Sequence, residues 1–354
     1  MTATTDLSGL HEELATVARD VLGTAHPDAT VDWGLIIRSG WVGLDVPSEF
    51  DGADATFAEV AVVLGEFGRA AARGPYPSVA LAMAALAGVD RHPARDELLT
   101  MVTGGDTVVV VALPAETNTV AFDLEITAGG ATVSGTAAFV LDAPYADRLL
   151  IPARDASGDV VLVDVDARSN GLELRPRPVV DATRSFADIT ADGVSVDAEH
   201  MWRCQTSGDF VSRLRDRAAA SIACDSLGIA EAMLDATVDY ARVREQFGRP
   251  IGSFQAVKHA CADMYVQVAI ARRLVGAAVT AVAAGDPDAG IAVSQAKSYA
   301  CDAAVAVAGK AIQLHGGIGY TWESGLHVYL KRATLNRALY GSPAHHRQLL
   351  ADRY

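Results

Sequence analysis

Residues 241–255 hold the side chains best suited to chemistry in this chain of 354 residues. The stretch reads Ala-Arg-Val-Arg-Glu-Gln-Phe-Gly-Arg-Pro-Ile-Gly-Ser-Phe-Gln, so Arg244 and Arg249 flank the aromatic Phe247. Guanidinium groups match phosphate oxygens in a forked geometry and also stack on planar rings. A ligand that combines phosphate with a ring would suit this stretch. A charged helix end without a ligand is the alternative.

A second stretch, residues 313–321, reads Gln-Leu-His-Gly-Gly-Ile-Gly-Tyr-Thr. Because glycine has no Cβ, the backbone at Gly316 and Gly317 can approach phosphate oxygens within hydrogen-bonding distance, with Gln313 nearby. A bare glycine motif is weak evidence by itself, since a turn between two helices uses the same residues. The case for a phosphate site rests on finding both stretches in one chain.

Three blocks of different periodicity must position these stretches. Helical spacing of apolar residues dominates the first block, short β-branched runs separated by Gly, Asn, Asp and Pro fill the second, and long Ala-rich helical segments return in the third. Long helices with short connections are typical of an antiparallel bundle. The sequence therefore predicts an α+β protein with a helical domain over 1–106, an antiparallel β domain over 107–200 and a four-helix bundle over 205–354.

The composition excludes some classes of binding partner. The formal net charge of −15 argues against nucleic acid or an anionic membrane as the main partner, because the overall field repels both. Four widely spaced cysteines show no metal-ligand pattern and fit a reducing compartment. We find no segment that approaches the roughly 20 apolar residues of a membrane span and no signal peptide, so we expect a cytoplasmic protein.

The order of the three blocks resembles the acyl-CoA dehydrogenase family of flavoproteins. The stretch 242–255 looks like that family's signature between its two longest C-terminal helices, and 313–321 looks like its second signature. The segment Trp-Val-Gly-Leu-Asp-Val-Pro-Ser-Glu-Phe at 41–50 is similar to its N-terminal connection. Three motifs in the right order make chance a poor explanation.

The resemblance implies a flavin site shared between subunits. In that family the C-terminal motifs of one chain bind the ADP half of an FAD whose isoalloxazine ring lies in the neighbouring chain. Carried over, Arg244 meets the pyrophosphate, Phe247 lines the adenosine region, and Gln313, Gly316 and Gly317 approach the diphosphate. The resemblance also implies an acyl-CoA substrate and an acceptor of the electron-transfer-flavoprotein type.

The expected catalytic base is missing. Family members remove the α-proton of an acyl-CoA with a glutamate while the β-hydride moves to the flavin, so a carboxylate must stand near the substrate. That glutamate usually follows a tyrosine near the C-terminus, and here the matching residue after Tyr340 is Gly341. A minority of members carry the base on the first long C-terminal helix, at a position that falls on Ala218.

The flavin-ring side is also altered. The family's β domain normally has a Trp-x-Thr or Trp-x-Ser strand and a Thr-Glu-Pro segment near the ring. This chain has Phe-Val-Leu at 139–141 and Leu-Pro-Ala-Glu-Thr-Asn at 113–118. Leu141 cannot donate a hydrogen bond to the flavin. The residues for the ADP half are thus retained, whereas those for the ring and the proton transfer are not.

We therefore expect the non-catalytic subunit of a hetero-oligomer, resembling the α2β2 enzymes of actinobacterial steroid side-chain degradation. One alternative is a homo-oligomeric enzyme with another base, and another is a scaffold without flavin. Interhelical or solvated charge is the more ordinary role for carboxylates in helices, and a surface pair the more ordinary role for adjacent histidines. The candidate bases are Asp216, Asp225, Glu231, His345 and His346.

Overall fold

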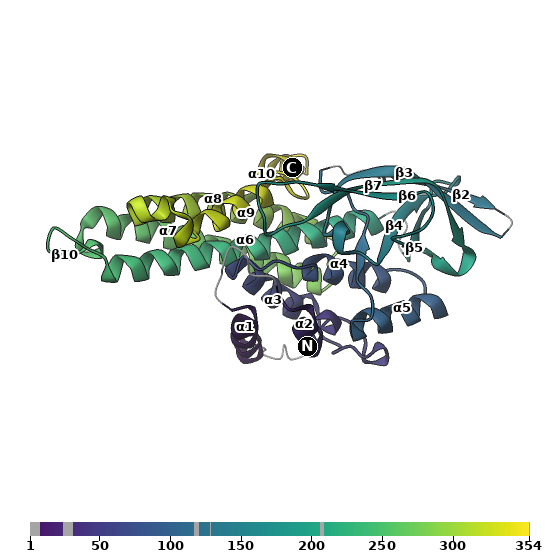
Figure 1. Ribbon diagram of the computed structural model, residues 1–354, viewed down its shortest axis with the longest axis horizontal. Coiled ribbons are helices and arrows are strands. Elements are labelled where there is room, and N and C mark those ends of the chain that lie inside the picture. Colours follow the sequence, from purple (N-terminus) through teal and green to yellow (C-terminus); the bar gives the residue numbers. More distant parts are fainter. Residues whose placement is uncertain (1–7, 24–30, 117–119, 128, 206–208, 354) are drawn as a thin grey trace.

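The computed structural model describes residues 8–23, 31–116, 120–127, 129–205 and 209–353. A long bundle of helices forms one half of the molecule and a twisted sheet the other, with the N-terminal helices packed beneath both (Figure 1). The fold class predicted from the sequence is confirmed. The elements follow the order helix, strand, helix along the chain.

Five helices form the N-terminal block, and short 3-10 turns connect some of them. Glu59 and Thr56 make a capping box at the start of α3, with the backbone N–H of Thr56 donating to Glu59 Oε2 at 2.8 Å. Buried residues such as Phe67 and Tyr76 join this block to the bundle in one core. The helices are α1 (Ser8–Leu22), α2 (Trp33–Arg38), α3 (Phe57–Arg69), α4 (Tyr76–Ala87) and α5 (Pro93–Gly104).

The sheet has the strand order β6-β7-β3-β2-β4-β5-β8, with β1 paired to β4. The sheet has an apolar core of its own. Residues that alternate along its strands, such as Val133, Ile151 and Ile189, form this core. The strands are β1 (Val109–Val111), β2 (Phe122–Thr127), β3 (Gly130–Leu141), β4 (Arg148–Arg154), β5 (Val160–Asp166), β6 (Leu172–Arg177), β7 (Phe186–Asp197) and β8 (Met201–Arg203).

The sheet corrects the expectation of a purely antiparallel domain. Strand β4 runs parallel to both β1 and β2, and the other pairs are antiparallel. The runs 131–134 and 138–141, which look separate in sequence, belong to the single strand β3, because register shifts between Val133 and Gly135 and between Ala137 and Val140 absorb the irregular spacing. Strands β2 and β8 were not expected from the sequence.

Four helices, three of them long, form the bundle, as predicted. Helices α3 and α6 approach each other closely at Gly228, where an added Cβ would collide with the carbonyl oxygen of Gly65. A short final helix, α10, was missed because its polar composition shows no apolar face. The helices are α6 (Phe210–Val243), α7 (Gln255–Ala283), α8 (Ala289–His315), α9 (Leu326–Ala338) and α10 (Pro343–Ala351).

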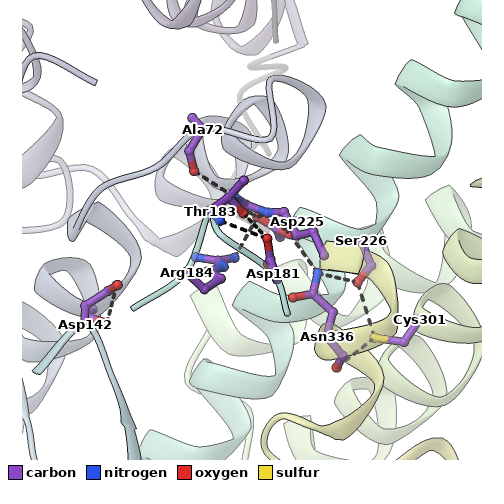
Figure 2. Close-up of polar contacts among 11 residues, drawn as sticks. Ala72, Asp142, Asp181, Thr183, Arg184, Asp225, Ser226, Cys301 and Asn336 are labelled. Carbon is purple, nitrogen blue, oxygen red and sulfur yellow. Dashed lines mark hydrogen bonds and ion pairs between the residues drawn. The ribbon is translucent and has the colours of Figure 1, made fainter. Parts of the chain in front are cut away.

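One buried ion-pair network ties the three blocks together (Figure 2). Asp225 of α6 accepts hydrogen bonds from Arg184, at 2.9 Å, and from Arg332 of α9, at 3.0 Å. Arg332 also donates to the carbonyl oxygen of Ala72 at 2.7 Å and to Thr183 Oγ1 at 3.0 Å. The network therefore fixes the bundle against both the N-terminal helices and the sheet.

Helix α7 is the one described helix that is long and apolar enough to cross a membrane, with a mean hydropathy of 1.5 over its most apolar window. The sequence predicts no membrane span, and one helix of this kind is only weak evidence for one. Core helices pass the same test, and α7 packs along α6 and α8. Its outer face exposes Tyr265, Val266 and Ile270, which are 60%, 54% and 42% accessible.

Candidate cofactor and active-site regions

The stretch singled out in sequence forms a hairpin at the tip of the bundle, at the end farthest from the sheet (Figure 1). Helix α6 ends at Val243, and β9 (Glu245–Gln246) pairs with β10 (Arg249–Pro250). The two turn residues, Phe247 and Gly248, have φ of +55° and +73°. Both central residues of the common tight hairpin turn need positive φ, which suits Gly248 and strains Phe247.

This turn leaves the Phe247 ring 92% exposed. A strained backbone that presents a large apolar side chain to solvent is typical of a binding position rather than of packing. Arg249 lies over the Phe254 ring, with its guanidinium carbon 4.2 Å from the ring centroid. Arg244 is exposed and has no side-chain partner among the described residues. A ligand anion can therefore reach Arg244 without displacing an internal ion pair.

The second motif lies at the same end of the bundle. The Tyr240 ring, one helical turn before Arg244, stacks on the His315 ring with centroids 4.3 Å apart. His315 ends α8, so Gly316 and Gly317 begin the turn that follows it. The structure thus brings the two sequence motifs to one end of the molecule.

The backbone of this turn is open to a ligand. Gly316 adopts φ of +62° and ψ of −138°, a conformation close to one that glycine alone adopts readily. A Cβ added at Gly316 or Gly317 would meet nothing within 4 Å, so these glycines are not required by internal packing. Gly319 differs, since its Cβ would collide with the Ile312 carbonyl oxygen. Gln313 is exposed, and its Oε1 accepts a hydrogen bond from Lys310 at 3.0 Å.

Two exposed aromatic residues near this turn were not identified from the sequence. Tyr320 is 80% and Trp322 74% accessible. The Trp322 ring packs edge-on against His327, and the Lys331 ammonium lies 4.9 Å from its centroid. A short turn rich in Gly and Ser carries no periodicity that could indicate which of its aromatic residues face solvent.

The two positions expected for a catalytic base lie at the opposite end of α6. Ala218 is 3% exposed and packed in the core. Gly341 has φ of +102°, and a Cβ there would lie 2.7 Å from Nε2 of His346 and 2.8 Å from Cδ2 of His345. No side chain fits at Gly341 unless these rings move. The first side-chain atom of a glutamate at this position would therefore collide with imidazole.

His346 is unsuited to act as the base in its place. It is 4% exposed, Nδ1 lies 3.1 Å from Ser294 Oγ, and Nε2 lies 3.0 Å from the Tyr340 carbonyl oxygen. Burial lowers the pKa of His346 to about 4, so the ring is neutral near pH 7. Both ring nitrogens are already used in internal hydrogen bonds. His345 is half-buried, and its ring packs edge-on against that of His346.

The strand expected beside a flavin ring is built for packing. Leu141 is 4% exposed and belongs to the main core, and Val140 is 1% exposed. Phe139 has φ of +55° and packs on Phe186 with centroids 5.3 Å apart. This part of β3 offers no side-chain donor to a ring. Residues 117–119 of the neighbouring segment lie outside the described residues.

The chain resembles known proteins over almost its whole length. A family model described as "Acyl-CoA dehydrogenase, C-terminal domain" matches residues 212–354. Acyl-CoA dehydrogenase IpdE2 of Mycolicibacterium smegmatis is 33% identical over 312 residues, which cover 88% of this chain and 84% of that relative. The chain belongs to the acyl-CoA dehydrogenase family. The resemblance inferred from the motifs is confirmed, and members of this family are oxidoreductases that act on CH–CH bonds.

Two solved structures of the same family are similar throughout. A chain of the ChsE4-ChsE5 complex from Mycobacterium tuberculosis superposes with a TM-score of 0.86 at 28% identity, covering 99% of this chain and 98% of that one. A chain of a variant of the steroid ACAD Tcur3481-Tcur3483 superposes with a TM-score of 0.82 at 27% identity, covering 98% and 96%.

As an acyl-CoA dehydrogenase without the usual glutamate, the chain has three other carboxylates to consider. Asp225 is 2% exposed, and the adjacent Arg332 and Arg184 hold its pKa at about 2 against the cost of burial. It is a structural anion. Glu231 is ion-paired with Arg272 at 2.8 Å on the bundle surface. Asp216 alone lines a cavity, and this cavity also contains Tyr340.

That cavity has a volume of 710 Å³ and lies between the sheet and the start of α6. Its walls come from the β4–β5 hairpin, the first turns of α6 and the segment from Tyr340 into α10. Burial raises the pKa of Asp216 to about 6, although Arg353 and Arg215 oppose the shift. Among the three carboxylates, Asp216 is therefore the one whose proton affinity approaches that of a base near neutral pH.

The raised pKa of Asp216 makes folding stability depend on pH. Because the folded pKa of about 6 exceeds the ordinary value of 3.8, the folded state binds the proton more tightly, and stability falls as the pH rises from about 4 to about 6. At pH 8 we expect the free energy of unfolding of Asp216→Asn, measured by urea denaturation, to exceed that of the wild type by about 1–2 kcal/mol. Near pH 4 the two proteins should be equally stable. Asp263→Asn, an exposed control, should show neither effect. Equal stability of Asp216→Asn and wild type at pH 8 would contradict this assignment.

Proposed function

We propose that this chain is the non-catalytic subunit of a hetero-oligomeric acyl-CoA dehydrogenase and contributes the ADP half of each FAD site. The observation that carries the proposal is that a side chain at Gly341 would collide with the neighbouring histidine rings. With Gly341 at one of the family's two base positions, crowded by the rings of His345 and His346, and buried Ala218 at the other, the chain lacks both usual bases of the family. A homologous partner would supply the base and the ring-binding strand.

The residues at the tip of the bundle fit the ADP half. Arg244 supplies an exposed positive charge for the pyrophosphate, and the open backbone at Gly316 and Gly317 can approach its oxygens. Gln313 is close enough in sequence to donate from the same helix end, and the Phe247 ring offers a face for stacking the adenosine. When bound, FAD supplies the group that accepts the hydride. The residues of this chain bind and orient its nucleotide end.

The length of α6 supports a site shared between chains. At about 1.5 Å of rise per residue, Arg244 lies roughly 40 Å along the helix from Ala218. One dinucleotide cannot reach from the tip to the region of Gly341 in the same chain. A nucleotide half held at the tip therefore needs a flavin ring held by another polypeptide.

Exposed apolar surface supports assembly with a partner. The outer face of α7 and the aromatic residues of the tip, Phe247, Tyr320 and Trp322, are far more exposed than apolar side chains of their size normally are. Similar proteins include the ChsE4-ChsE5 complex and a steroid ACAD. By this likeness we propose a homologous subunit as partner, a CoA thioester from steroid degradation as substrate, a cytoplasmic location, and an acceptor of the electron-transfer-flavoprotein type.

The proposal predicts the flavin content of purified protein. The chain alone should be colourless or weakly yellow, and co-expression with a homologue that carries the glutamate should give a yellow complex with about one flavin per pair of chains. Arg244→Ala should weaken flavin retention about tenfold or more, since a charge-assisted contact is lost. Arg242→Ala, which removes an exposed charge paired with Asp239, is the matched control. Unchanged flavin in the Arg244→Ala complex would refute the ADP-binding role.

One observation favours a second candidate function. Because Asp216 lines a cavity with Tyr340 and has a raised pKa, the chain by itself could be a homo-oligomeric enzyme with an unusual base. In that case the chain expressed alone would hold stoichiometric flavin that bleaches on adding acyl-CoA, and Asp216→Asn would abolish the bleaching. A complex that forms but holds no flavin would instead indicate a scaffold subunit.

A further inference from the structure

Tyr240 joins the two motifs at the tip of the bundle. Its backbone carbonyl oxygen accepts a hydrogen bond from the Arg244 N–H at 2.9 Å, where α6 ends and the hairpin begins. Its hydroxyl donates to the His315 carbonyl oxygen at 3.4 Å, and its ring stacks on the His315 ring at an interplanar angle of 21°. Among the described residues, no other hydrogen bond or ring contact links 240–255 to 313–321.

The ring of His315 is held in place by its own helix. It is 9% exposed, and its Nδ1–H donates to the Ala311 carbonyl oxygen, one turn earlier in α8, at 2.8 Å. A buried ring that is already hydrogen-bonded loses little further freedom when a second ring stacks on it. Stacked aromatic rings also stabilise a structure beyond the apolar area that they bury. The Tyr240 ring therefore contacts a ring whose position α8 fixes.

The two motifs have no side-chain contacts of their own that could set their separation. Arg244 is exposed and has no side-chain partner among the described residues. Gly316 and Gly317, which begin the glycine turn (Gly316–Tyr320), have no side chains, and the space around their Cβ positions is open. The position of Arg244 relative to the glycine turn therefore depends on how the end of α6 meets the end of α8.

We propose that Tyr240 and His315 are positioning residues, whose stacked rings set the distance between Arg244 and the glycine turn so that both can contact one pyrophosphate. Groups that bind a ligand must be held within about 0.5 Å of the productive geometry by the packing and hydrogen bonds behind them. The Tyr240 ring on His315 provides such support without touching the nucleotide. This inference rests on the proposed ADP-binding role, because it concerns the same site.

The test is titration of FAD into the flavin-free complex of this chain with its co-expressed homologue, followed by the quenching of flavin fluorescence. Tyr240→Leu removes the ring and should weaken FAD binding about three- to tenfold, because the stacked pair is lost. Tyr240→Phe keeps the ring and loses only a long hydrogen bond, so its FAD affinity should stay within about twofold of the wild type. His315→Leu should weaken FAD binding as well, and its effect should not add to that of Tyr240→Leu, since both remove the same stack.

Met233→Ala separates positioning from general stability. Met233 is 2% exposed in the core of α6, about two turns before Tyr240. Its truncation should make the complex unfold at a lower urea concentration and leave the affinity for FAD unchanged. An FAD affinity that falls as far in Met233→Ala as in Tyr240→Leu would mean that lost stability explains the effect, and the positioning role would be wrong.

The pattern of variants also distinguishes this inference from the proposed function. If Arg244→Ala weakens FAD binding and Tyr240→Leu does not, the ADP-binding role stands and the positioning role is overturned. If neither variant weakens FAD binding, both are overturned. Tyr240→Phe that loses as much affinity as Tyr240→Leu would show that the stacked ring is not what matters, which also contradicts the inference.

Discussion

Replacement of Asp225 by Ala is expected to lower the free energy of unfolding by about 3–5 kcal/mol. The carboxylate is 2% exposed and accepts hydrogen bonds from two buried guanidiniums, those of Arg332, 0% exposed, and Arg184, 5% exposed. Removing the anion leaves two cations in a low dielectric without an ion-paired carboxylate, since Asp142 and Asp181 act on them only from beyond ion-pair distance. Equilibrium urea unfolding at pH 7 measures the loss.

The expected size of this loss comes from the unpaired cations and not from the strength of one ion pair. Asp302→Ala removes a carboxylate from surface pairs with Arg337 and Arg347, and it should cost less than about 1 kcal/mol, as exposed pairs do. Asp225→Asn keeps hydrogen-bonding capacity and removes only the charge, so it should fall between the two. A loss at Asp225→Ala no larger than at Asp302→Ala would show that the network does not hold the blocks together.

The loss of stability at low pH provides a second measurement of the same network. Its cations hold the pKa of Asp225 near 2, below the ordinary value of 3.8. The contribution of this carboxylate to stability is therefore complete above about pH 4 and is lost as the pH falls toward 2. The wild type should lose stability over this window, and Asp225→Ala should lose less of it.

The order of the helical and β blocks along the chain could be predicted from the sequence, because long helices and alternating strands have periodic patterns of apolar residues. The bundle helices were placed to within a few residues, since more than 20 residues of apolar spacing define each of α6, α7 and α8. Strand β2 was missed because its six residues alternate weakly, with a burial pattern that becomes exposed from Glu125 onward. The parallel pairing of β4 depends on contacts far apart in sequence, which local patterns do not encode.

Some residues of the candidate site could likewise be indicated by the sequence, whereas others required the structure. Arg244 and Gly316 were recognisable because their types and spacing are characteristic, and the structure places both at one end of the bundle. The cavity beside Asp216 was not recognisable, because a carboxylate in the first turns of a helix resembles any solvated charge until its burial is seen. The meaning of Gly341 also changed. The sequence showed only that a glutamate is absent, whereas the structure shows that the rings of His345 and His346 leave no room for a Cβ at this position.

Restoring the glutamate at Gly341 should therefore fail to create an active site. We expect Gly341→Glu to lower the free energy of unfolding by about 3 kcal/mol or more and to add no dehydrogenase activity to the chain or its complex. Two costs combine. A side chain at φ of +102° is strained, and its Cβ would lie 2.7 Å from the His346 ring.

Alanine variants separate these two costs. Gly325 has φ of +67° and open space around its Cβ, so Gly325→Ala pays only the backbone strain of about 1 kcal/mol. Gly341→Ala pays strain and collision, and it should be less stable than Gly325→Ala by a clear margin in the same urea titration. Because the collision is with one ring, His346→Ala should recover part of the loss in a double variant, and the two substitutions should be non-additive. Additive losses would mean that the His346 ring does not restrict a side chain at Gly341. Gly341→Glu that folds like the wild type and turns over acyl-CoA would mean that the missing glutamate alone makes this subunit non-catalytic.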